Sequence, residues 1–199
     1  MRKALLVVGV QRDLCPGGAF AVPDGDRVAM RLSAVGSAID HAGDLVIAAR
    51  DWLPADAESF ASGRVAPYCV AGTAGAGFHP GLQLSSRTRQ VFRAEDPEEN
   101  GHSAFRSLAR DAAPLERLLR DAQVEELFLG GLPLERTIRA TAMDALRRGF
   151  DVTVLQDCVA AYDAQAGREV LTALRLSGAR VTSSGEAILS LYKSGEARL

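Results

Sequence analysis

The sequence predicts a three-layer α/β/α fold of the Rossmann-like type, with a mostly parallel six-stranded sheet that carries helices on both faces. Two observations lead to this prediction. Short apolar runs rich in β-branched residues alternate along the chain with amphipathic helical patterns. Glycines follow several of these helical patterns, at the place where a helix usually ends. Strands that alternate with helices in this way are typical of a parallel sheet.

Each element has its own signal. The expected strands are the apolar runs 4–10, 44–49, 89–92, 125–131, 151–157 and 179–184. The expected helices are 25–41, 113–122, 134–148 and 164–177. In the third of these, Ile138, Ala142, Ala145 and Leu146 share one apolar face. The segment 51–88 is rich in Gly, Pro, Ala and Ser without clear periodicity, and a loop of that length is usually functional.

The composition is that of a globular protein. The chain has 199 residues, 47% of them hydrophobic, and a net charge of −2. We expect one domain over residues 1–199, with its core over about 3–190. The near-neutral charge does not favour nucleic acid or an anionic membrane surface as a partner. No apolar run approaches the roughly 18 residues that a membrane span needs.

The N-terminus and the cysteines bear on location. The apolar run 4–10 is too short for a signal peptide and has no small-residue cleavage site after it. Cys15, Cys69 and Cys158 are an odd number of cysteines without metal-like spacing. We therefore expect a cytoplasmic protein with reduced thiols.

Several spaced stretches match a known pattern, in order, over nearly the whole chain. They are 4–26, 48–54, 59–62, 67–82, 96–105 and 130–157. Together they resemble the isochorismatase-like (cysteine hydrolase) superfamily, and most closely its nicotinamidase/pyrazinamidase branch. The resemblance implies an amidase with an Asp–Lys–Cys triad, in which the cysteine attacks and the aspartate is the base. It also implies a metal, held by one aspartate and several histidines, that orients the substrate.

The resemblance places other residues at the triad positions. The family's aspartate opens a D-V-Q-x-D-F pattern, and here GVQRDL puts Gly9 at that position. The family's lysine comes three residues before D-P-E, which is Arg93 here, or Ala94 if the alignment slips by one. The family's cysteine ends a G-[LIV]-A-T-D-x-C pattern, and here GLPLERT ends at Thr137. None of the three catalytic residues is kept.

The implied metal and oxyanion groups are replaced as well. The family's metal-ligand positions hold Asp51, Leu53, Ala57 and Tyr68. One carboxylate without imidazole partners does not hold a transition metal tightly, so we expect no metal and no other cofactor. In the family, the backbone N–H at position 133 donates to the oxyanion. Pro133 has no N–H, and losing one such donor typically costs about a hundred- to a thousand-fold in rate.

Some of these residues have more than one reading. Thr137 as a nucleophile would need a base, which Gly9 does not supply, so we expect its hydroxyl to bond a backbone group of the first turn. Arg93 either binds a carboxylate or phosphate, or forms a structural ion pair with Asp13 or Glu135, and we favour the ion pair. Asp51 is expected in a turn or cap, and Asp13 as a hydrogen-bond acceptor. Cys158 is either a reactive thiol or a small buried hydrophobe, and we favour the second.

The sequence also nominates residues for a ligand pocket at the carboxyl ends of the strands. They are Asp13, Leu14, Asp51, Trp52, Tyr68, Arg93, His102, Pro133 and Thr137. Leu14 and Val65 stand where relatives carry aromatic residues, so we do not expect a pyridine ligand.

These substitutions predict a pseudoenzyme, inactive by the family mechanism, that binds a ligand or a protein. Two alternatives stay open. One is a hydrolase that acts on a small amide or a related C–N or ether substrate through a non-standard site. The other is a structural subunit in a mixed oligomer with an active relative. We expect a small-molecule ligand of unknown identity and a homo-oligomer, which could include the active relative.

Overall fold

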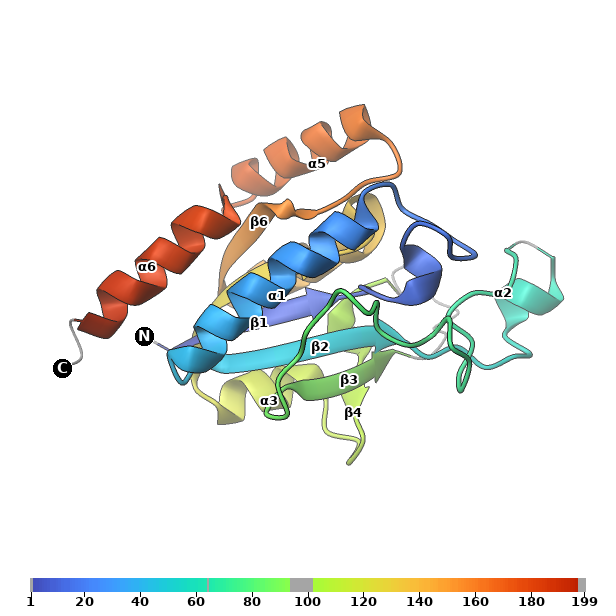
Figure 1. Cartoon of the computed structure of the whole chain (residues 1–199), viewed down its shortest axis with the longest axis horizontal. Coiled ribbons are helices and arrows are strands. Elements are labelled where there is room, and N and C mark those ends of the chain that lie inside the picture. Colours follow the sequence, from blue (N-terminus) through green and yellow to red (C-terminus); the bar gives the residue numbers. More distant parts are fainter. Residues whose placement is uncertain (1, 64, 94–101, 197–199) are drawn as a thin grey trace.

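A seven-stranded sheet runs through the molecule in the order β4-β3-β2-β1-β5-β6-β7 (Figure 1). The computed structural model describes residues 2–63, 65–93 and 102–196. The strands are β1 (Arg2–Val8), β2 (Leu45–Asp51), β3 (Arg89–Arg93), β4 (Leu108–Ala109), β5 (Val124–Gly131), β6 (Asp151–Val159) and β7 (Arg180–Thr182). Neighbouring strands are parallel, except that β4 runs antiparallel to β3.

Helices cover both faces of this sheet. They are α1 (Gly25–His41), α3 (Leu115–Asp121), α4 (Arg139–Arg147), α5 (Ala164–Leu176) and α6 (Ser184–Glu196), whereas the short helix α2 (Glu58–Ala61) lies in the loop after β2, away from the sheet (Figure 1). Two 3₁₀ turns, η1 (Arg12–Leu14) and η2 (Ala104–Arg106), and one π-helical turn, η3 (Leu134–Ile138), complete the elements. Helices α1 and α6 lie on one face (Figure 1) and share its apolar core, whereas α3, α4 and α5 contribute to the core of the other face.

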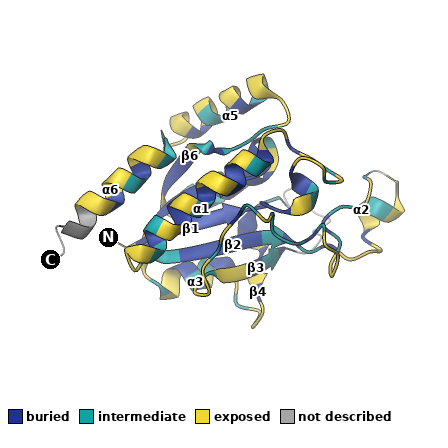
Figure 2. Cartoon of the chain, in the orientation of Figure 1, coloured by how far each residue is buried: buried dark blue, intermediate teal, exposed yellow. Residues whose placement is uncertain are grey.

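Strand β1 shows why the sequence forms this fold. Leu5 and Val7 enter the core beside α1, and Leu6 and Val8 enter the core on the opposite face. A parallel strand buried on both faces has to be apolar at every position, which explains the unbroken run ALLVV. Figure 2 shows β1 and β2 as buried, with the exposed residues on the outer sides of the helices.

The predicted α/β class is confirmed, whereas the predicted number of strands is one too low. The missing strand is β4, and its two residues are too few to produce a periodic pattern. Helix α6 was also missed, although its start has a sequence signal. Ser183 and Glu186 form a capping box, in which the Glu186 N–H donates to Ser183 Oγ and the Ser183 N–H donates to Glu186 Oε2, at 3.3 and 3.1 Å.

The topology determines where a ligand can bind. The chain leaves β1 through α1 toward β2, and it leaves β5 through η3 and α4 toward β6, in the opposite direction along the sheet. Ligands of open α/β sheets bind at the carboxyl ends of strands around such a switch point. The described part of the chain contains no helix of the length and apolarity that crossing a membrane requires.

Candidate functional site

The residue after β1 is Gly9, and its surroundings leave no space for a side chain. Its φ is +68°, which is in the left-handed region. A Cβ built at Gly9 would lie 2.4 Å from the Leu132 carbonyl oxygen. The base position that the resemblance implies is therefore closed by neighbouring backbone as well as empty of a carboxylate.

The turn after β5 carries Pro133 and Thr137, at the implied oxyanion and nucleophile positions. The Leu132–Pro133 peptide bond is cis, and Pro133 is buried. The chain then enters the π-helical turn η3, in which the Ile138 N–H donates to the Pro133 carbonyl oxygen at 3.2 Å. Thr137 lies on this turn with 4% of its surface exposed. With no N–H on Pro133, the turn offers one fewer oxyanion donor than the family site.

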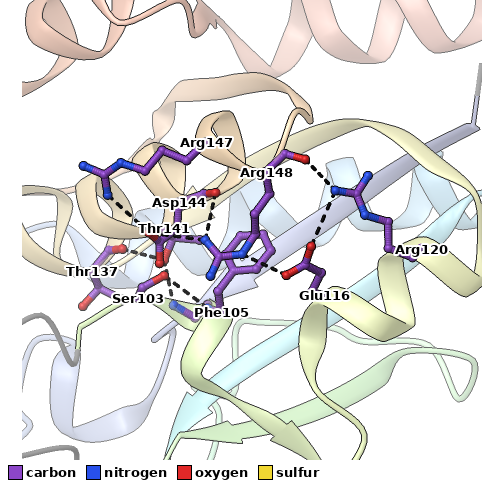
Figure 3. A network of polar contacts seen from close by, with 10 residues as sticks. Ser103, Phe105, Glu116, Arg120, Thr137, Thr141, Asp144, Arg147 and Arg148 are labelled. Atoms are coloured by element: carbon purple, nitrogen blue, oxygen red, sulfur yellow. Dashed lines mark hydrogen bonds and ion pairs between the residues drawn. The ribbon is translucent and has the colours of Figure 1, made fainter.

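The hydroxyl of Thr137 does not form the backbone bond that we expected. Among the described residues, it has no hydrogen-bond partner. The hydroxyl of Thr141, one turn later on α4, performs this role instead. It donates to the Thr137 carbonyl oxygen at 2.7 Å and accepts from the Ala104 N–H at 2.9 Å (Figure 3). Thr141 thus joins the turn after β5 to η2, because a hydroxyl can donate and accept at once.

Asp51 and Arg93 form a buried ion pair at the carboxyl ends of β2 and β3. They face each other in the strand register. Arg93 Nη2 and Nε lie 2.5 and 2.9 Å from Asp51 Oδ1, and the two side chains are 10% and 8% exposed. The expected ion pair of Arg93 exists, but its partner is neither Asp13 nor Glu135. The expected turn or cap role of Asp51 is wrong for the same reason, since its carboxylate is held by a guanidinium.

Gln11 is a buried residue of this region to which the sequence interpretation assigned no role. Its Nε2 donates to the Asp51 and Ala76 carbonyl oxygens at 2.8 and 3.0 Å, and its Oε1 accepts from the Asp51 N–H at 2.7 Å. An amide is suited to this task because it both donates and accepts. A polar residue directly after the apolar run 4–10 is the signal that could have identified Gln11.

The residues at the implied metal position do not fit a metal. Asp51 is committed to Arg93, and the buried side chains of Leu53 and Ala57 have no ligand atom. Tyr68 holds its proton firmly, because burial first and the charge of Asp51 second raise its pKa to about 12. No group of three or more His, Cys, Asp or Glu side chains able to hold a metal occurs within residues 2–63, 65–93 and 102–196.

Tyr68, His102 and Arg136 lie close enough to the ion pair for their charges and pKa values to be coupled to it. Burial lowers the pKa of His102, and the charges of Arg93 and Arg136 lower it further, against the opposite effect of Asp51. The Tyr68 phenol experiences the same three charges. Its ring stacks on Phe20 with centroids 4.9 Å apart. Arg136 is exposed, and no described residue forms an ion pair with it. The sequence interpretation did not select Arg136, although it directly precedes Thr137.

The other expected pocket residues divide into two groups. Leu14 is buried, with its Cδ1 3.4 Å from the Cβ built at Gly9. Asp13 Oδ2 accepts a hydrogen bond from the Cys69 N–H at 2.7 Å. Trp52 lies away from the ion pair, because it follows Asp51 and its ring packs beside Phe92 and Arg50. Ala94 and most of the stretch 96–105 fall outside the described residues.

The three thiols are buried and protonated. Burial is the largest cause in each case, and it raises the pKa of Cys15 to about 11 and that of Cys158 to about 12. It also raises the pKa of Cys69, together with the nearby charges of Asp51 and Asp13. Since the thiolate is the reactive form, these cysteines are poor nucleophiles.

Comparison with known proteins agrees with the fold and the motifs. A family model for the isochorismatase domain matches residues 3–186. The chain belongs to the isochorismatase family. The nicotinamidase of Escherichia coli (strain K12) is 34% identical over 173 residues, which are 78% of this chain and 81% of the relative. The nicotinamidase/pyrazinamidase of Mycobacterium tuberculosis is 30% identical over 188 residues, which are 92% of this chain and 99% of the relative.

A solved structure of a relative has the same fold. The crystal structure of the pyrazinamidase of Pyrococcus horikoshii in complex with zinc has a TM-score of 0.83 and 30% identity, and the match covers 92% of this chain and 99% of that chain. The chain therefore shares the family's fold. In this isochorismatase-family chain, the aspartate of the implied metal position is bound by an arginine.

Proposed function

We propose that this family member does not perform the amidase reaction and uses its pocket to bind a small acidic molecule. The observation that carries the proposal is the buried pair Asp51–Arg93. The pair takes the carboxylate of the implied metal position and the side chain of the implied lysine position out of any reaction. Gly9 adds no base, and Pro133 adds no oxyanion donor.

The surrounding carboxylates also argue against a reactive Thr137. A hydroxyl attacks only when a base takes its proton. Asp51 is paired with Arg93, and Asp13 accepts from the Cys69 N–H. Glu135 Oε1 accepts from the Asp163 N–H at 3.1 Å, which directs this carboxylate toward the start of α5. Each of these three acids has a partner other than Thr137, and none of them forms a hydrogen bond with the Thr137 hydroxyl.

The charge of the pocket supports an acidic ligand. Arg93 is paired with Asp51, whereas Arg136 forms no ion pair with a described residue and offers its guanidinium to an acidic ligand. A guanidinium suits a carboxylate because its planar fork can donate two hydrogen bonds to the two oxygens. Tyr68 and the hydroxyl of Thr137 are further donors on the pocket wall.

The proposal is tested with matched acids and amides. Binding of small carboxylic acids and of their neutral amides is measured by calorimetry, and ammonia release is measured on the same amides. We expect the acids to bind at least about ten-fold more tightly, which is 1.4 kcal/mol. We also expect Arg136→Gln to weaken acid binding, while Arg139→Gln, which removes the same charge from the exposed start of α4, leaves it intact.

Two results would overturn the proposal. Ammonia release that disappears in Thr137→Ala would make Thr137 a nucleophile and this chain an active amidase. Equal binding of acids and amides, unaffected by Arg136→Gln, would remove the charge argument.

A further inference from the structure

Two arginines share one aromatic ring on the opposite face of the sheet from the Asp51–Arg93 pair. Arg50 precedes Asp51 on β2, so its side chain points to the face that α1 covers. Its guanidinium carbon lies 4.6, 5.0 and 4.8 Å from the ring centroids of Trp52, Phe78 and Phe92. The guanidinium carbon of Arg110 lies 5.6 Å from the centroid of the same Phe92 ring.

These two positive charges lack a negative partner among residues 2–63, 65–93 and 102–196. No residue that the structure describes forms an ion pair with Arg50 or Arg110. Arg50 Nε is buried without a hydrogen-bond partner. The pKa of Arg50 is lowered by burial first and by the charge of Arg110 second, so the two guanidiniums repel each other. The aromatic rings stabilise each cation, but they accept no hydrogen bond from Arg50 Nε and leave the repulsion in place.

A hollow lies directly beside Arg110. Its volume is about 370 Å³, and it is lined by Thr88, Arg89, Gln90, Ala109, Arg110 and Asp111. The Thr88 hydroxyl is buried without a hydrogen-bond partner. Asp111 is the acid nearest to this arrangement in sequence, and its Oδ1 accepts from the Ala113 N–H at 3.3 Å. A hollow of this size is within the range of small-molecule sites.

We infer that Arg50 and Arg110 form a binding site for a phosphate group, on the opposite face of the sheet from the pocket of Thr137. A phosphate near neutral pH carries almost two negative charges and several acceptor oxygens. It would balance the two positive charges and offer acceptor oxygens to the guanidinium N–H groups. The hollow beside Arg110 would hold the organic part if the phosphate belongs to an ester. The site does not depend on whether the family reaction is lost.

The test combines calorimetry with the fluorescence of Trp52, which is the single tryptophan of the chain. Inorganic phosphate and phenyl phosphate are titrated at constant ionic strength. We expect saturable binding that changes the Trp52 emission and is at least ten-fold weaker in Arg110→Gln. Arg110→Lys should bind with intermediate affinity, because it keeps the charge and loses the planar fork. Arg27→Gln removes the same charge from the exposed surface of α1 and should bind as the wild type does.

The two probes separate the sources of the phosphate. Tighter binding of phenyl phosphate supports an ester, and equal binding supports free phosphate. Absence of saturable heat with both probes in the wild type would overturn the inference. So would an equal loss of affinity in Arg27→Gln and Arg110→Gln, because binding would then reflect net charge alone.

Discussion

Buried ion pairs lie at both ends of the sheet, and they are built differently. At the amino ends, Glu126 of β5 is shared by Lys3 of β1 at 3.9 Å, Arg180 of β7 at 2.5 Å and the Thr153 hydroxyl of β6 at 3.0 Å. At the carboxyl ends, Asp51 has Arg93 as its one cationic partner among the described residues.

The difference concerns redundancy. Glu126 keeps a cation and a hydroxyl donor if Lys3 is lost, since Arg180 and Thr153 hold its other oxygen. Asp51 keeps no cation if Arg93 is lost, because Gln11 binds the Asp51 backbone and not its carboxylate. The amino end thus joins four strands, whereas the Asp51–Arg93 pair at the carboxyl end joins β2 to β3.

The largest expected effect comes from breaking each pair. Arg93→Leu leaves a buried carboxylate without a cation, which should lower the free energy of unfolding by about 3–5 kcal/mol. Lys3→Leu should lower the free energy of unfolding by less, because Arg180 still forms an ion pair with Glu126. Urea denaturation at neutral pH measures both. The double variant Asp51→Leu/Arg93→Leu should recover most of the loss. Equal losses in Arg93→Leu and Lys3→Leu would contradict this reading of redundancy.

A second comparison uses two glycines with similar backbone angles. Gly9 at the carboxyl end has φ +68°, and Gly43 before β2 has φ +76° with no atom within 4 Å of a built Cβ. Aspartate at either position should lower the free energy of unfolding by about 1–2 kcal/mol, because the residue has to adopt the left-handed conformation. At Gly9, the close contact with Leu132 should lower the free energy of unfolding by about 1–3 kcal/mol more, because the site is overpacked.

The expected order of thermal stability is therefore wild type, then Gly43→Asp, then Gly9→Asp. If the proposed function holds, the Gly9→Asp variant should also show no amidase activity. A Gly9→Asp protein as stable as Gly43→Asp would show that the end of β1 can open to accept a base.

A third comparison separates two threonines at the carboxyl end. Thr141→Val removes the partner of the buried Ala104 N–H and of the Thr137 carbonyl, at a cost of about 1–3 kcal/mol. Thr137→Val should change stability little, because its hydroxyl bonds to no described residue. The denaturant midpoints of the two variants measure this difference in stability. A larger loss of stability in Thr137→Val than in Thr141→Val would mean that the Thr137 hydroxyl supports the fold.

The smallest expected effect is on the pH dependence of stability. The pKa of His102 in the folded state lies below its ordinary value of 6.5, so the unfolded state takes up a proton first as the pH falls. The stability contributed by neutral His102 is thus present above pH 6.5 and is lost as the pH falls from 6.5 toward the folded pKa.

His102→Asn should flatten the loss of stability in this acidic range. His41→Asn, at the exposed end of α1, serves as the control and should follow the wild type. Identical pH profiles for His102→Asn and the wild type would argue against a positive field in the pocket.

The sequence alone determined the layout of the fold and the membership of the family. Strand β1 could be predicted because a strand covered on both faces is apolar at every position, and α1 could be predicted because its apolar residues repeat with helical spacing. The replacements at Gly9, Pro133 and Thr137 follow from spaced motifs that stay in order along the chain. Such signals are local, so one sequence suffices to detect them.

Tertiary structure alone decided which side chains meet. Arg93 binds Asp51 because parallel strands place residues 42 positions apart in register, and no local pattern encodes that pairing. The side chain of Trp52 points away from Asp51, because successive residues of a strand point to opposite faces of the sheet. Arg50 and Trp52 therefore pack beside Phe92, on the face opposite to Asp51. Pairing across a sheet depends on the register between distant segments, and register forms only when the chain folds.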